Sequence, residues 1–218
     1  MKSSLHKGGF RALQATQFLE AFNDNAFKVI VTFLAIDYFS NHGGGTFFVA
    51  LAGVVFITPF LLFSTFAGHL ADKFSKRNIL IIAKISEVFL MVAGLFSFLH
   101  LSIWGMLTVL FMMGLHSAFF SPSKYAILPE ILDEDDLSEG NGQLQMFTYA
   151  AIILGQASGG YLLDVFKGMP YKSSFVFIGI SIAGLITSFF ITKVPPAGSQ
   201  RKAQWNFVKE IVENTRYV

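Results

Sequence analysis

The chain has 218 residues and is too apolar to be an ordinary soluble domain. Hydrophobic residues make up 53% of it and only 14% of its residues are charged, whereas soluble proteins carry about 25% charged residues. The absence of Cys excludes a disulfide framework and a Cys-ligated metal site. A net charge of +2 is too small to indicate nucleic-acid binding. The composition therefore predicts an all-α membrane protein.

Six apolar segments are long enough to be transmembrane helices, each of which needs about 20 residues to cross the hydrocarbon core. In chain order they are residues 12–39, 46–68, 78–98, 101–120, 141–163 and 173–192. We expect residues 1–194 to form a six-helix transmembrane bundle and residues 195–218 to form a cytoplasmic linker. In the linker, Trp205, Val208 and Ile211 share one face of a predicted amphipathic helix.

The distribution of Lys and Arg predicts that both termini are cytoplasmic. Twelve of these residues fall on one side of the predicted spans and two, Lys167 and Lys172, on the other. Cytoplasmic loops carry the excess of Lys and Arg, and acidic residues contribute little to this rule. The twelve are Lys2, Lys7, Arg11, Lys73, Lys76, Arg77, Lys124, Lys193, Arg201, Lys202, Lys209 and Arg216.

The first span contains the charges of greatest interest. Glu20, Asp24 and Lys28 recur every four residues and form one stripe on a helix, with Asn23 close to it. Charges within a membrane span are expensive, so they should face the bundle interior and mark a substrate or ion site. The alternative is an Asp24–Lys28 salt bridge that only fixes helix packing. Proton or sodium coupling through Glu20 or Asp24 stays open.

Two other charged positions have weaker functional interpretations. In the third span, Lys84 and Glu87 are three residues apart, and the long Lys84 side chain is expected to snorkel to the cytoplasmic interface. After the fourth span, Lys124 could bind an anionic group. The alternative for Lys124 is a basic cytoplasmic loop next to an interfacial Tyr125.

In the fifth span, Gly155 and Gly159 have the G-x-x-x-G spacing that permits close helix packing. We interpret this motif as a packing feature. The His residues are scattered along the chain without a metal-binding spacing, so no metal site is predicted.

Residues 68–77 read GHLADKFSKR and lie between two spans. This run resembles the loop signature of the major facilitator superfamily, with Ser75 where the family usually has Gly. The resemblance implies a six-helix half of a facilitator fold, in which the Gly is expected to allow close helix approach. It also implies a conformational switch formed by Gly68, Asp72, Lys73, Lys76 and Arg77.

Two further segments resemble bacterial lysophospholipid transporters, especially versions fused to acyltransferase and acyl-ACP ligase domains. They are residues 22–28 (FNDNAFK) and 121–130 (SPSKYAILPE). The resemblance covers the N-terminal half of such a transporter, so a second six-helix half is the expected partner. It implies movement of lysophospholipid, a membrane lipid, across the bacterial inner membrane for reacylation on the cytoplasmic side.

For such a substrate, Asp24 and Asn23 would meet an ammonium or hydroxyl group, and Lys28 or Lys124 would meet the phosphate. Glu20 belongs to the same site. No ATP-binding or catalytic motif is present, so we predict neither a cofactor nor an enzyme activity for these residues. Two rivals remain: a facilitator for another small solute or drug, and a membrane anchor for a fused acyltransferase. A dimer of two six-span chains is a further alternative.

Overall fold

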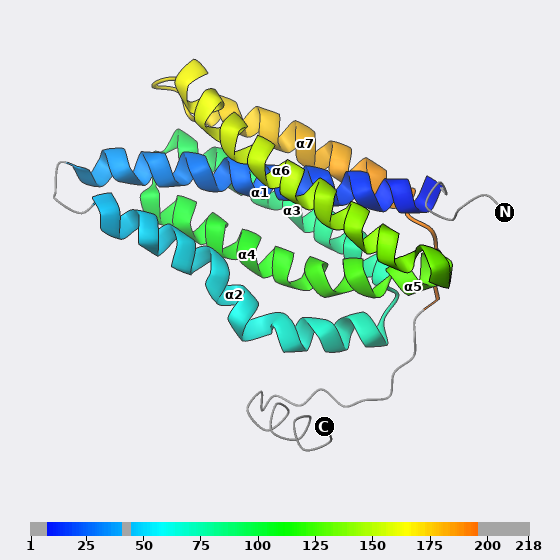
Figure 1. Ribbon diagram of the computed structural model, residues 1–218. Coiled ribbons are helices and arrows are strands. Elements are labelled where there is room, and N and C mark those ends of the chain that lie inside the picture. The colour runs from blue at the N-terminus through cyan, green and yellow to red at the C-terminus, as the bar shows by residue number, and fades with distance from the viewer. Residues whose placement is uncertain (1–7, 41–44, 196–218) are drawn as a thin grey trace.

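The computed structural model describes residues 8–40 and 45–195, and this part of the chain is a bundle of long helices (Figure 1). The long helices are α1 (Gly8–Ser40), α2 (Gly45–Lys73), α3 (Lys76–Leu99), α4 (Ile103–Ala126), α6 (Leu137–Val165) and α7 (Tyr171–Phe189). A short helix, α5 (Leu128–Ile131), and a 3₁₀ turn, η2 (Glu134–Asp136), connect α4 to α6. The predicted linker helix lies outside the described residues.

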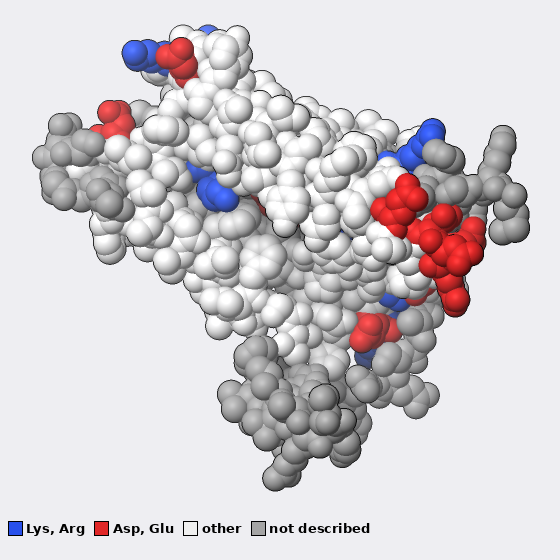
Figure 2. Space-filling view, viewed as in Figure 1, with Lys and Arg blue, Asp and Glu red and all other residues white. Residues whose placement is uncertain are grey.

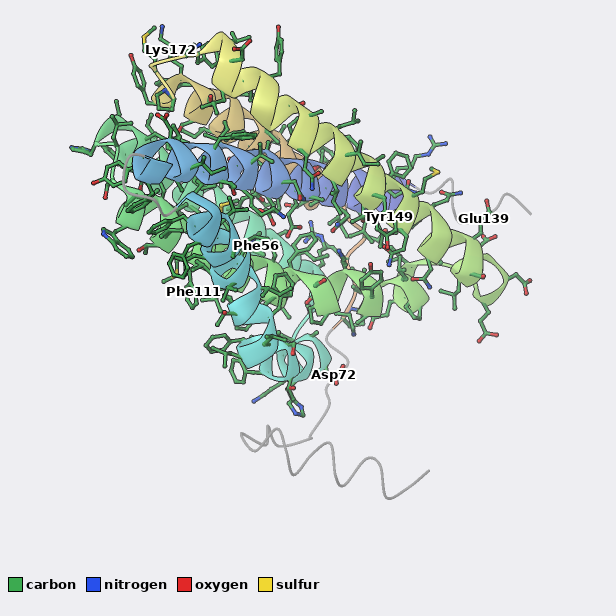
Figure 3. All side chains as sticks on the ribbon, turned by 60° about the vertical axis from the view of Figure 1, so that its left-hand side comes forward. Phe56, Asp72, Phe111, Glu139, Tyr149 and Lys172 are labelled. Carbon is green, nitrogen blue, oxygen red and sulfur yellow. The ribbon has the colours of Figure 1, made fainter. Side chains whose placement is uncertain are left out.

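Five of the six long helices are long and apolar enough to cross a membrane by length and composition alone. The remaining one, α1, has 33 residues but carries the charged stripe, and it lies among the other five. On the face shown in Figure 2, charged side chains gather mainly at the ends of the bundle, whereas most of the surface between them has none. Figure 3 shows Lys172 and Glu139 at opposite ends. This arrangement is that of a six-helix membrane bundle.

Helix α1 is the central element, because it packs against α2, α4, α6 and α7, while α3 packs on α4 and α7. The glycines of α6 allow a close approach to α1. A Cβ atom added at Gly155 would lie 2.5 Å from the carbonyl oxygen of Phe22, and one added at Gly159 would lie 2.6 Å from that of Ala26. The packing interpretation of the G-x-x-x-G motif is therefore confirmed.

Two apolar cores fill the two ends of the bundle and leave a polar belt between them. One core includes Leu13 of α1, and the other begins on α1 at Ala26. The buried side chains of α1 between these two positions are mostly polar, and each needs a hydrogen-bond partner on a neighbouring helix. They are Gln14, Thr16, Gln17, Glu20, Asn23, Asp24 and Asn25.

Helix α2 changes direction midway along its length (Figure 1). Pro59 lies inside this helix and is buried. A proline removes one backbone hydrogen bond and clashes with the preceding turn, so it bends the helix at that point. The bend occurs beside Phe56 and Phe60, which line the cavity described below.

Candidate functional site

The two acidic residues of the α1 stripe meet one hydroxyl group on α4. The Ser117 hydroxyl donates to Asp24 Oδ2 over 2.6 Å and lies 3.3 Å from Glu20 Oε1. A hydroxyl has a single hydrogen, so Ser117 can donate to only one carboxylate at a time. The other oxygen atoms, Glu20 Oε2 and Asp24 Oδ1, make no hydrogen bond within the described part of the chain. Both carboxylates therefore keep an acceptor for a ligand.

These carboxylates line a cavity of about 150 Å³ between α1, α2, α4 and α6. Its polar lining residues are Gln17, Glu20, Asp24, Asn25, Ser117, Ser121 and Lys124. Its apolar lining residues are Ala21, Phe56, Phe60, Phe120 and Ile152. The cavity can thus receive a charged group and an apolar group at the same time.

Lys124 supplies the positive charge of the cavity wall. It lies within α4, not in a loop, and only 7% of its surface is exposed. Its ammonium group is 5.0 Å from the ring centroid of Tyr125 and near enough to Glu20 and Asp24 to interact with them electrostatically. The alternative of an exposed basic loop is therefore wrong, because Lys124 points into the bundle.

Lys28 does not form the salt bridge with Asp24 that was the structural alternative for this stripe. Its ammonium group instead donates to Asn25 Oδ1 over 3.1 Å and lies 5.1 Å from the ring centroid of Phe56. Lys28 is half-buried, one turn beyond Asp24. It therefore offers a second cation close to the cavity without neutralising the carboxylate.

Asn23 points in a different direction from Asp24 and does not line the cavity, although it was expected beside the head group. Its amide nitrogen donates to Glu87 Oε1 over 3.0 Å and to the carbonyl oxygen of Phe177 over 3.2 Å. Successive residues of a helix are separated by 100°, so Asn23 and its neighbour Asp24 point in different directions. Asn23 faces α3 and α7, and Asp24 faces α4.

The prediction that Lys84 snorkels to the interface is also wrong. Lys84 has no exposed surface and forms an ion pair with Glu87, of which 1% is exposed.

Two residues without a sequence signal join the site from α4. One is Ser117, and the other is His116, whose Nδ1 is 3.9 Å from Glu20 Oε1. A lone Ser or His in an apolar span is indistinguishable from a packing residue until its neighbours are known.

The charged segment between α2 and α3 lies apart from the cavity, and the structure places its residues differently. Asp72 and Lys73 are exposed, whereas Lys76 is buried and forms an ion pair with Glu130. An added Cβ at Gly68 would have no atom of the described residues within 4 Å. The close helix approach expected at Gly68 is therefore not seen here.

This segment is tied to the end of α7. Arg77 donates from Nε to the carbonyl oxygen of Ile191 and from Nη2 to that of Phe189, both over 2.7 Å. Ser75, at the position where the family usually has Gly, donates to the carbonyl oxygen of Val194 over 2.9 Å. A guanidinium group that binds terminal carbonyls also complements the negative end of the helix dipole.

Among residues 8–40 and 45–195, no group of three or more His, Asp or Glu side chains could hold a metal ion. The carboxylates that line the cavity can instead accept hydrogen bonds or bind a singly charged cationic group. The site thus combines two carboxylates, nearby cations and aromatic rings within a membrane bundle.

Residues 16–216 match the sequence profile of the Major Facilitator Superfamily. The chain belongs to this superfamily. It is a multi-pass membrane protein of a transporter family, and the expectation of a facilitator fold is confirmed.

Curated relatives include the lysophospholipid transporter LplT of Photorhabdus laumondii, which is 27% identical over 94% of this chain and 48% of the relative. The transporter of the same name from Enterobacter sp. is 32% identical over 74% of this chain and 38% of the relative. The chain thus spans about half the length of the first of these relatives. A crystal structure of a POT family transporter in complex with 5-aminolevulinic acid aligns with a TM-score of 0.65 at 15% identity, covering 96% of this chain and 44% of that one. This last similarity concerns the fold alone.

Proposed function

We propose that this chain is the N-terminal half of a transporter that moves lysophospholipid across the bacterial inner membrane by alternating access. The observation that carries the proposal is the cavity at α1 and α4, which joins charged groups of both signs to three Phe rings. A lysophospholipid has a charged head group and one acyl chain, so its binding site needs a polar wall and an apolar wall together. The similarity to lysophospholipid transporters supports this substrate class.

The charged residues divide into two roles. Glu20 and Asp24 retain buried oxygen atoms that accept no hydrogen bond from the described residues, and these would accept hydrogen bonds from an ammonium or hydroxyl group of the head group. Lys124 and Lys28 would bind the phosphate, since ammonium groups act as point charges toward phosphate oxygens. The rings of Phe56 and Phe60 on α2 and Phe120 on α4 would contact the first methylene groups of the acyl chain.

The transport cycle requires a second six-helix half. Facilitators bind their substrates between two halves near the middle of the membrane and rock one half against the other. We place both termini in the cytoplasm, which follows from the asymmetry of Lys and Arg. Lysophospholipid would then be delivered for reacylation by an acyltransferase or acyl-ACP ligase, while these residues themselves catalyse no reaction.

In this scheme, the segment from Gly68 to Arg77 acts in the conformational switch. Its exposed Asp72 and Lys73 lie away from the cavity, so they would contact different partners in the two states. Arg77 and Ser75 tie the segment to the end of α7. Movement at the end of α2 would therefore be transmitted to the sixth span.

The test is uptake of lysophosphatidylethanolamine by the protein as its native gene encodes it, reconstituted in liposomes. We expect Asp24→Asn to abolish most of the uptake, because it removes the charge while keeping the size of the side chain. Asp37→Asn is the matched control, since Asp37 is on the same helix but exposed. Both variants are checked for yield and thermal stability.

Normal uptake by a well-folded Asp24→Asn protein would refute the assignment of the site. If wild-type protein transports another small solute but no lysophospholipid, the facilitator rival is correct. If the wild-type protein transports neither and instead retains an acyltransferase at the membrane, the anchor rival is correct.

A further inference from the structure

A second polar cluster lies beside α1, and its residues do not line the cavity. It consists of Asn23 on α1 and the ion pair of Lys84 and Glu87 on α3, and at most 1% of each of these residues is exposed. The function proposed above leaves this cluster without a role, although buried charges within a membrane are costly and seldom retained without one.

The cluster ties three helices together through one side chain. The Asn23 amide donates both of its hydrogens, one to Glu87 on α3 and one to the carbonyl oxygen of Phe177 on α7. Glu87 uses its other carboxylate oxygen for the ion pair with Lys84. Lys84 in turn packs on α7, because a Cβ added at Gly184 would lie 2.6 Å from its Cε atom. Rotation of α1 about its axis would move the Asn23 amide away from both acceptors.

Stability alone is a weak reason for this arrangement. Well-packed apolar residues can replace a buried ion pair at little or no cost in stability, whereas removal of one partner is strongly destabilising. The best-attested use of such groups is to select one arrangement of helices over others. On the side of α1 that faces α3 and α7, Asn23 supplies two directional contacts, and Thr16 supplies one more to Thr187 on α7.

We propose that Asn23, Lys84 and Glu87 form a polar clamp that sets the rotation of α1 and so turns Glu20 and Asp24 toward the cavity. These three are positioning residues, and they act on the head-group site through α1 without touching the substrate. The identity of the substrate in this proposal rests on the proposed function, whereas the contacts of the clamp do not depend on it. It also explains why Asn23 lies beside Asp24 in the sequence and yet faces another helix.

The first experiment replaces the ion pair with apolar residues of similar length. The double variant Lys84→Met with Glu87→Met should fold, because both charges are removed together, but it leaves one Asn23 amide hydrogen without its acceptor. Residues 1–218 contain no Cys, so in the full protein, with any Cys elsewhere replaced by Ser, the Ser121→Cys variant gives a single reporter on the cavity wall. We measure its labelling by a water-soluble maleimide, with and without lysophosphatidylethanolamine.

With the clamp intact, lysophosphatidylethanolamine should slow the labelling. In the double Met variant, the lipid concentration that gives half-maximal protection should rise about tenfold. This is the change in affinity expected when one hydrogen bond that positions the site is lost. The labelling rate without lipid should also change, because rotation of α1 alters the surroundings of the Cys at position 121. Equal rates and equal protection in a stable double variant would overturn the clamp. If lipid fails to protect even with the clamp intact, the proposed substrate is wrong, and the rate without lipid still tests the clamp.

The second experiment moves the clamp without changing its polar groups. Gly184→Ala places a methyl group where the buried end of Lys84 lies, whereas Gly179→Ala on the same helix meets nothing within 4 Å. Only Gly184→Ala should weaken protection of the Ser121→Cys reporter and alter its labelling rate. If the double Met variant does not fold, the comparison of Gly184→Ala with Gly179→Ala tests the proposal by itself. Identical behaviour of these two variants would refute the proposal.

Discussion

The close contact between α1 and α6 is a sharp test of the packing, because two adjacent glycines of α6 differ in their surroundings. A Cβ at Gly159 would lie 2.6 Å from the carbonyl oxygen of Ala26 and 3.0 Å from the Cβ of Val29. A Cβ at Gly160 would have no neighbouring atom within 4 Å in the described part of the chain. Gly159→Ala and Gly160→Ala are therefore the same chemical change on the same helix, with and without a clash.

The expected magnitudes follow from these distances. In a helix, Gly is less favourable than Ala by about 0.8–1.0 kcal/mol, so Gly160→Ala should be neutral or slightly stabilising. Gly159→Ala has the same gain, but the methyl group forces backbone atoms apart, and overpacking of this kind costs about 1–3 kcal/mol. The difference in unfolding free energy between the two variants should thus be about 1–3 kcal/mol.

Thermal unfolding in detergent, followed by circular dichroism at 222 nm, measures this difference. For a chain of 150–250 residues, 1 kcal/mol corresponds to about 2–4 °C in Tm, so Gly159→Ala should unfold roughly 2–12 °C below Gly160→Ala. Equal Tm values for the two variants would show that α6 does not approach α1 as described. The arrangement of the cavity between α1 and α6 would then need revision as well.

Three other predictions concern the switch and the orientation. Asp72→Asn should slow lysophospholipid uptake but leave equilibrium binding unchanged, because Asp72 is exposed and outside the cavity; an equal loss of binding, measured by isothermal titration, would contradict this role. Arg77→Lys should lower the stability of the protein by about 0.5–1.5 kcal/mol, because Lys can replace only one of the two carbonyl contacts; an unchanged Tm would mean that these contacts contribute nothing. Single Cys residues placed at Ser138 and Met169 lie near opposite ends of α6. An impermeant maleimide should label the Cys at position 138 only from the cytoplasmic side, and the Cys at position 169 only from the periplasmic side. The reverse pattern would refute the predicted orientation.

Much of the fold was predictable from the sequence because the membrane limits the choices. A long apolar span must form a helix whose backbone groups are satisfied internally, so length and hydropathy alone locate five helices. The close packing at Gly155 and Gly159 was predictable for a similar reason, since small residues one turn apart leave room for a neighbour. Local composition was sufficient in both cases.

The charged stripe of α1 was only partly predictable. Its spacing placed Glu20, Asp24 and Lys28 on one side of a helix, and the structure does bring both carboxylates to one cavity. The alternative, a salt bridge between Asp24 and Lys28, is not observed, because Lys28 donates to Asn25. Ser117 could not be found from its own segment, since its role depends on the two α1 carboxylates that it contacts.

The sequence by itself determined which residues lie on the same face of each helix, because the 100° step between residues is a local property of the backbone. Only the tertiary structure decided what each face meets. Asn23 and Asp24 are adjacent in the chain, yet the packing of α3 and α7 on one side and α4 on the other gives them different partners. Lys84 likewise could have reached the interface, but the apposition of α1, α3 and α7 encloses it with Glu87. The absolute rotation of a helix depends on all its neighbours at once, and no single segment of sequence contains that information.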